Sequence, residues 1–204
     1  MPLKEDNMRE LTSIQEKILD KALYLIGKNG SLKVSIRSIA KEANVNVSAI
    51  NYYFGTKDEM LNHVKQFYID NTFSAYSILD NDAYGSEEKV ILSSNEIMEY
   101  TLKYPGIITI LKEAIKNKDI NEIDAKIVEV TNNMNEKLDK ALSNVLRGND
   151  TMIKYNKMIF ISSLLYPVIN CDLENFDPSL FHSKEKRLEY ISHIVDSLKS
   201  PSNK

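Results

Sequence analysis

Residues 34–61, with the sequence VSIRSIAKEANVNVSAINYYFGTKDEML, contain two short amphipathic segments separated by a tight turn. The first begins at Ser35 and carries apolar side chains at helical spacing, which predicts a helix that ends before Asn44. A second short helix is expected from Asn46, whose side chain can cap it, to about Phe54. Asn44 suits the turn, because asparagine adopts the left-handed backbone conformation more readily than most residues other than glycine. This arrangement is typical of a helix-turn-helix, whose second helix enters the DNA major groove.

Capping motifs predict the helices on either side of this segment. Ser13 and Glu16 form a capping box, in which the hydroxyl accepts an early backbone N–H and the carboxylate accepts the N–H of the serine. Thr56 and Glu59 form a second box at the start of a long following helix. We therefore expect four helices within roughly the first 80 residues, where Asn81 begins a polar turn.

The rest of the chain also has the spacing of helices, and we find no alternating strand pattern of useful length. Helices are expected over about 90–102, 107–117, 123–145, 150–166 and 183–199. Asp150 is expected to cap the helix over 150–166, and Pro167 is expected to end it. The most apolar stretch, Met158 to Ile169, is shorter than the roughly 20 residues of a membrane helix and is expected to be a buried core helix.

The expected fold class is all-α, with two domains. A helix-turn-helix DNA-binding domain is expected over residues 1–56, and a larger helical domain for ligand binding and dimerisation over residues 57–204. The composition, 43% hydrophobic and 27% charged residues with few glycines and prolines, excludes disordered and low-complexity proteins. Lys and Arg outnumber Asp and Glu by 10 to 8 in residues 1–66, whereas acidic residues prevail 21 to 16 in the remainder.

The sequence offers little for catalysis. Its three histidines are scattered, no paired cysteines or zinc-binding motif is present, and no nucleophile elbow is visible, so we expect no enzyme, no cofactor and no metal. The single cysteine, Cys171, rules out an intramolecular disulfide. Together with the lack of a basic-then-apolar leader, it favours a cytoplasmic protein without a membrane partner.

Residues 16–30, EKILDKALYLIGKNG, followed by residues 34–61, resemble the DNA-binding domain of the TetR family of bacterial transcriptional repressors. The Tyr-Tyr-Phe sequence at 52–54 and the Gly-Thr-Lys after it make the resemblance more specific than a bare helix-turn-helix. The chain departs from the family at Asn44, where glycine is commoner, and at Asn51, where tyrosine is frequent. The resemblance implies a three-helix head, a fourth helix leading to a helical body, homodimerisation through the last two helices, and a small-molecule pocket in the body.

Ten residues are expected to contact double-stranded DNA. Small side chains begin the recognition helix and face base edges, and the amide of Asn51 can bond to adenine or, alternatively, to the neighbouring helix. Arg37 can contact guanine or phosphate, whereas tyrosine, serine and lysine side chains at the flanks can position phosphates. The expected contacts are Lys33, Ser35, Arg37, Val47, Ser48, Ala49, Asn51, Tyr52, Tyr53 and Lys57. Phe54 is expected in the core.

Two further sites are expected in the body. The last helix has an apolar stripe wide enough to pack on its own subunit and on a second copy, or else to be a deeply buried monomer helix. The dimer residues are expected to be Leu188, Ile191, Ile194, Val195 and Leu198. Aromatic and methionine side chains suit an apolar effector pocket, although core packing explains them equally well. These are Phe73, Tyr76, Met98, Tyr100, Tyr104, Met134, Tyr155, Met158 and Tyr166.

The favoured function is a transcriptional repressor that a small apolar or aromatic effector releases from a palindromic operator. In this interpretation the helix over residues 56–79 transmits the effector signal to the DNA-binding head. The alternative is a DNA-associated or protein-interaction factor that binds no small molecule. A thermal-shift screen separates the two, because a ligand that binds only the folded protein raises its melting temperature.

Overall fold

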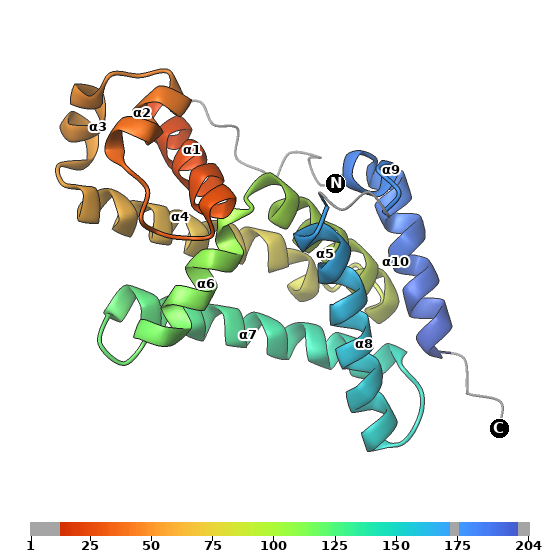
Figure 1. Cartoon of the computed structure of the whole chain (residues 1–204). Coiled ribbons are helices and arrows are strands. Elements are labelled where there is room, and N and C mark those ends of the chain that lie inside the picture. Colours follow the sequence, from red (N-terminus) through yellow and green to blue (C-terminus); the bar gives the residue numbers. More distant parts are fainter. Residues whose placement is uncertain (1–12, 172–175, 200–204) are drawn as a thin grey trace. The chain divides into compact units, whose positions relative to one another are not determined.

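A computed structural model describes residues 13–171 and 176–199, and over these ranges the chain is helical with no strand (Figure 1). The all-α fold class expected from the sequence is therefore confirmed. The helices are α1 (Ile14–Asn29), α2 (Ile36–Ala43), α3 (Val47–Phe54), α4 (Lys57–Tyr76), the 3₁₀ turn η1 (Ser77–Asp80), α5 (Ser86–Lys103), α6 (Gly106–Asn117), α7 (Glu122–Val145), α8 (Asp150–Ile169), α9 (Ser179–His182) and α10 (Lys184–Lys199).

The chain forms two compact units. The first comprises residues 1–74 and 104–132, and the second comprises residues 75–103 and 133–204. The first unit is larger than the domain expected over residues 1–56, because most of α4, all of α6 and the start of α7 pack together with α1, α2 and α3. The functional boundary after residue 56 remains a prediction.

Both capping boxes predicted from the sequence are present. The Glu16 N–H donates to Ser13 Oγ at 3.1 Å, and the Ser13 N–H donates to a Glu16 carboxylate oxygen at 3.3 Å. In the second box, the Thr56 N–H donates to Glu59 Oε2 at 2.7 Å, and the Glu59 N–H donates to Thr56 Oγ1 at 3.2 Å. The backbone and hydroxyl hydrogen bonds from Thr56 lower the pKa of Glu59, so the box keeps its charge at neutral pH.

Two glycines allow α1 and α6 to approach closely within the first unit. A Cβ atom added to Gly106 would lie 2.2 Å from the carbonyl oxygen of Leu23, and one added to Gly27 would lie 2.6 Å from the Gly106 nitrogen. Gly27 lies inside α1, whereas Gly30 ends the helix with a φ of 59°. The contact therefore requires that neither helix carries a side chain where they meet.

Buried polar contacts join α4 to α7 in the same unit. Lys65 Nζ lies 2.8 Å from Asp124 Oδ1, and both side chains are almost completely buried. The hydroxyls of Tyr68 and Thr131 are 3.1 Å apart. Removing one partner of a buried ion pair leaves an uncompensated charge, so this pair strongly favours one register of α4 on α7.

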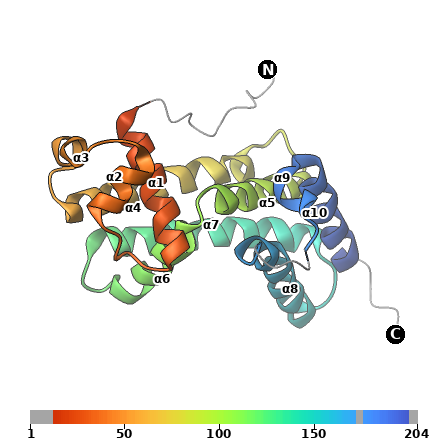
Figure 2. The ribbon, with the colours of Figure 1, turned by 45° about the horizontal axis from the view of Figure 1, so that its top comes forward.

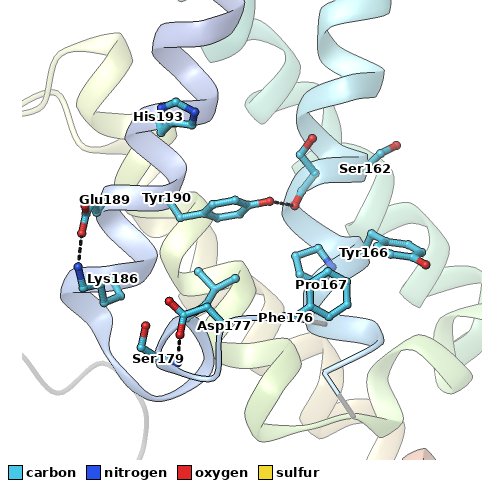
Figure 3. Close-up of a pocket in the computed structure, with 12 residues that line it drawn as sticks. Ser162, Tyr166, Pro167, Phe176, Asp177, Ser179, Lys186, Glu189, Tyr190 and His193 are labelled. Carbon is cyan, nitrogen blue, oxygen red and sulfur yellow. Dashed lines mark hydrogen bonds and ion pairs between the residues drawn. The ribbon is translucent and has the colours of Figure 1, made fainter. Parts of the chain in front are cut away.

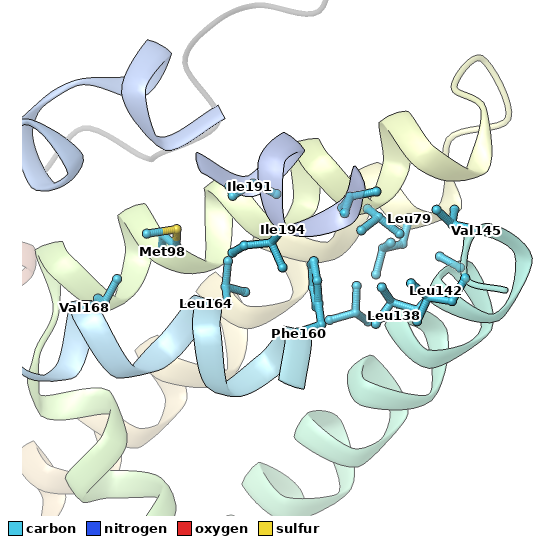
Figure 4. Packing of buried hydrophobic residues seen from close by; sticks show 14 of the residues in the cluster. Leu79, Met98, Leu138, Leu142, Val145, Phe160, Leu164, Val168, Ile191 and Ile194 are labelled. Atoms are coloured by element: carbon cyan, nitrogen blue, oxygen red, sulfur yellow. The ribbon is translucent and has the colours of Figure 1, made fainter. Parts of the chain in front are cut away.

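The core of the second unit lies between α5, the end of α7, α8 and α10 (Figure 4). Phe160 and Leu164 of α8 pack there with Ile191, Ile194 and Val195 of α10, and all five are buried. These three α10 residues were expected in the dimer interface, but they contact their own unit because the apolar stripe of α10 faces its core. Leu188 and Leu198 are only half-buried.

Arg187 of α10 is buried at the same interface. Its guanidinium donates to Asn95 at 3.0 Å and to a carboxylate oxygen of Glu99 at 2.8 Å, both on α5. Burial and the nearby Glu99 charge raise the pKa of Glu96. Sequence periodicity did not predict this network, because an arginine next to an apolar stripe ordinarily lies in solvent.

The sequence-based prediction that Pro167 ends its helix is wrong, since α8 continues to Ile169. Proline has no N–H to donate to the carbonyl four residues earlier, which here belongs to Ser163. The hydroxyl of Tyr190 on α10 donates to that carbonyl at 2.8 Å. A side chain therefore replaces the missing helical hydrogen bond, and the helix can continue. The expected cap is also corrected by one residue, since Asn149 rather than Asp150 caps α8.

We predict that Gly106→Ala destabilises the protein although alanine favours helices. The added methyl group would meet the Leu23 carbonyl, and overpacking of this kind costs about 1–3 kcal/mol. Urea unfolding of the variant should show a lower midpoint. Gly85→Ala is the control, because a Cβ atom there has no neighbour within 4 Å. Equal stability of Gly106→Ala and the unsubstituted protein would contradict the close approach of α1 and α6.

Candidate nucleic-acid interface

The turn between α2 and α3 has the geometry that the sequence predicts. Asn44 ends α2 with a φ of 52°, in the left-handed region, and the Val45 N–H donates to the Ala40 carbonyl at 3.0 Å. Asn46 then caps α3, because its side-chain oxygen accepts the Ala49 N–H at 2.7 Å. These contacts fix where the recognition helix begins.

The two faces of α3 have different roles. Ile50 and Phe54 are buried and hold the helix on its unit, which confirms Phe54 as a core residue. The opposite face exposes four residues that are predicted to contact DNA, and Figure 2 shows α3 beside α2 in the first unit. They are Val47, Ser48, Asn51 and Tyr52. Tyr52 is 83% exposed, which is unusual for a tyrosine without a partner molecule.

Two of the predicted DNA-contacting residues also cap helices. The Ser35 hydroxyl accepts the Ser38 N–H at 3.0 Å at the start of α2. Ser48 donates its hydroxyl hydrogen to the Asn46 side chain, so toward DNA its oxygen can only accept a hydrogen bond. Ala49 and Tyr53 are half-buried at the edge of the exposed face.

The surface around α2 and α3 is basic. Lys33 and Arg37 are exposed and Lys57 is half-buried. Residues 33–57 contain four cationic side chains and one carboxylate, which gives a net charge of +3. The N-terminus of α2 adds free backbone N–H groups, which favour an anion such as phosphate. The structure thus brings all ten predicted DNA-contacting residues onto α2, α3 and their flanks, while their individual contacts remain predictions.

The nine residues predicted to contact an effector do not gather at one cavity. Met98, Tyr100, Tyr104 and Met134 are buried. Tyr104 packs edge-on against Phe67 with 5.6 Å between ring centroids, and burial raises its pKa to about 12. These contacts favour the alternative of core packing for the four residues.

The other five effector candidates lie nearer the surface. Phe73 is exposed on α4 and Tyr76 is half-buried, while the remaining three are exposed on α8: Tyr155, Met158 and Tyr166. The expectation of a wholly buried helix over Met158 to Ile169 is therefore wrong, because one face of α8 packs on the core and the other is exposed.

A cleft of about 910 Å³ opens between α8 and the α9–α10 segment of the second unit (Figure 3). Of the nine effector candidates, only Tyr166 lines it. Sequence reasoning missed its other aromatic residues, Phe176 and Tyr190, as ligand contacts. Pro167 was the available signal, because a proline within a helix leaves a carbonyl for another group to bond.

Within the described ranges, no three His, Cys, Asp or Glu side chains lie close enough to hold a metal ion together. The helices described there also include none whose length and apolar character would let it span a bilayer.

Comparison with known proteins identifies the first unit. Residues 18–64 match the family model described as bacterial regulatory proteins, tetR family. The chain is 42% identical over 57 residues to the "Probable HTH-type transcriptional regulator YttP" of Bacillus subtilis, and 40% identical over 47 residues to the HTH-type transcriptional regulator BetI of Agrobacterium fabrum. These matches cover 28% and 23% of this chain, and the same shares of the two relatives.

Solved structures share the fold over nearly the whole chain. The TetR family transcriptional regulator PfmR from Thermus thermophilus aligns with a TM-score of 0.64 and 20% identity, covering 93% of this chain and all of PfmR. HlyIIR, a hemolysin II transcriptional regulator, aligns with a TM-score of 0.57 and 22% identity, covering 92% of this chain and 98% of HlyIIR. At these identities the likeness establishes the fold.

We predict that Arg37→Ala and Tyr52→Ala each weaken binding to a DNA site selected from a random pool. Loss of a direct base contact by Arg37 should cost about 1–3 kcal/mol and relax the base preference at one position. A phosphate contact would instead weaken binding to all sequences alike. Gel-shift titration measures both effects, with Lys140→Ala as the control because it removes an exposed charge from α7. Unchanged affinity in both variants would disprove the assignment.

Proposed function

The chain belongs, through its N-terminal domain, to the TetR family of bacterial transcriptional regulators, and we propose that it is a repressor of the ligand-responsive kind. In this proposal a dimer binds a palindromic operator, and a small molecule releases it. The single observation that carries the DNA-binding part is the exposed face of α3. Its donors, acceptors and apolar groups project from a basic head with no partner on the first unit.

The recognition helix supports sequence-specific binding. Val47 offers an apolar contact for a thymine methyl group, and Asn51 offers an amide that can bond to adenine. The basic flanks supply the phosphate contacts that position a helix in the groove without specifying bases. A polar and apolar face between cationic flanks fits DNA better than an acidic protein partner, because such a partner would require no base-sized donors and acceptors.

We place the dimer interface on α8 rather than on the buried stripe of α10. The exposed face of α8 carries five large apolar side chains, spaced by three, four, seven and three residues, which is the seam pattern of paired helices. They are Met152, Tyr155, Ile159, Tyr166 and Ile169, each between 38% and 58% exposed. Ser162 occupies the remaining seam position and is small enough for two helices to cross closely there. Contiguous exposed apolar surface of this kind supports contact with a second copy.

The release step uses α4. This helix begins at Lys57, two residues after the recognition helix ends, and runs to Tyr76, which belongs to the second unit. An effector that favours one position of α4 would change how well two heads match successive half-sites on DNA. Operator binding and effector binding would then oppose each other.

We predict that Ile159→Asp converts the dimer to monomers, because the new carboxylate would lie unpaired in the seam. Sedimentation velocity measures the change, and the same variant should bind a palindromic site more weakly. Ile120→Asp is the control, since Ile120 is 86% exposed on the first unit and the substitution is identical. A dimeric Ile159→Asp protein would place the interface elsewhere. Ile191→Asp is unsuitable, because Ile191 is fully buried in its own unit.

We predict reciprocal coupling between effector and operator. A compound found by thermal-shift screening should bind about 5- to 150-fold more weakly when the protein is bound to operator DNA, and should weaken operator binding by the same factor. Isothermal titration with and without operator DNA measures both. Equal affinities would reject the release mechanism, and a screen without any ligand would favour a DNA-binding factor that lacks an effector.

A further inference from the structure

The cleft between α8 and α9–α10 has the size and lining of a small-molecule site. Its volume of about 910 Å³ lies within the range of about 300–1,000 Å³ that is typical of ligand pockets. All its lining residues belong to the second unit. Buried Pro167 and Leu180 form apolar parts of its surface, and the hydroxyls of Ser162, Ser163 and Ser179 lie at its walls.

Aromatic rings stand on two sides of the cleft. Tyr166 and Phe176 meet edge-on with 6.0 Å between ring centroids, and Phe176 meets Phe181 in the same way at 6.4 Å. Tyr190 extends from α10 toward α8, where its hydroxyl is held by the Ser163 carbonyl at 2.8 Å (Figure 3). Because both groups of rings are fixed by neighbours, a flat molecule could enter without a large rearrangement of the walls.

The charges at the cleft favour a cation. Lys186 donates to Glu189 at 2.8 Å, so this lysine is already neutralised by a carboxylate. Asp177 accepts hydrogen bonds from the backbone and side chain of Ser179, which lower its pKa and keep it ionised. With His193 neutral, these titratable groups carry one net negative charge, contributed by a carboxylate whose hydrogen-bond donors are uncharged.

We propose that this cleft binds a planar aromatic cation, which stacks between Tyr166 and Tyr190 with its positive charge toward Asp177. The faces of aromatic rings attract cations, and an ionised carboxylate adds direct attraction. A planar anion is disfavoured, because the lysine that could receive it is paired with Glu189. The proposal deepens the ligand-responsive function above and rests on it for the biological role alone, since binding is measured without DNA.

The test uses the full-length protein and three probes of similar shape: N-methylquinolinium, neutral quinoline and the anion 1-naphthoate. Isothermal titration at neutral pH should show N-methylquinolinium binding about 5- to 10-fold more tightly than quinoline, with naphthoate weakest. Asp177→Asn should remove the preference for the cation while quinoline binding is retained. Asp119→Asn, an equal charge change on the first unit, should leave the preference intact.

A second pair of variants separates the cleft from the proposed dimer seam. Tyr166 and Tyr155 both lie on the exposed face of α8, and they are 58% and 57% exposed, but only Tyr166 lines the cleft. Tyr166→Ala should weaken N-methylquinolinium binding about 10-fold, whereas Tyr155→Ala should not change it. Circular dichroism checks that each variant is folded.

Three results would overturn the proposal: no preference for the cation, an equal effect of the two tyrosine variants, or binding confined to concentrations at which sedimentation shows monomers. The last result would mean that a second copy covers the cleft. Gel-shift titration of the same protein with DNA reports separately on the proposed function, so a protein that binds DNA but not the probe refutes this inference alone.

Discussion

The backbone of α6 starts so close to α1 that no side chain fits between them, and the composition of the first unit depends on this contact. With glycine on both sides, the turn after α5 can rest on the α1 backbone at the Leu23 carbonyl. That contact brings α6 and the beginning of α7 into the same compact unit as the recognition helix. The buried Lys65–Asp124 pair adds a second link, from α4 to α7. A DNA-binding head that packs with these helices is held by more than the three helices of its own motif.

The parts of the structure that depend on nearby residues were predictable from the sequence. Capping boxes, the left-handed Asn44 and the Asn46 cap each involve groups within four residues of one another, so the sequence contains the whole interaction. The basic, exposed recognition face follows from the same local pattern. These contacts account for why the candidate DNA interface was predicted residue by residue.

Contacts between distant residues explain what the sequence could not supply. Pro167 was expected to end α8, and only the position of Tyr190 on another helix shows which group satisfies the Ser163 carbonyl. Apolar periodicity identifies a stripe but not what covers it. The stripe of α10, with Ile191 at its centre, therefore proved to be core, while the exposed face of α8 around Tyr155 was assigned to a pocket. The cleft residues come from three helices, and no spacing in the chain connects them.

The asparagine at the helix-turn-helix turn also affects the unfolded chain. Asn44 holds a φ of 52°, which costs a non-glycine residue some strain of about 1 kcal/mol in the native turn. A glycine would avoid that strain, but it would give the unfolded chain more conformations to lose on folding, a difference of about 0.4–1 kcal/mol. The two effects are of similar size and opposite sign. Asn44 can therefore stand where glycine is usual with little net change in the free energy of folding, and its entropic restriction acts before the recognition helix has formed.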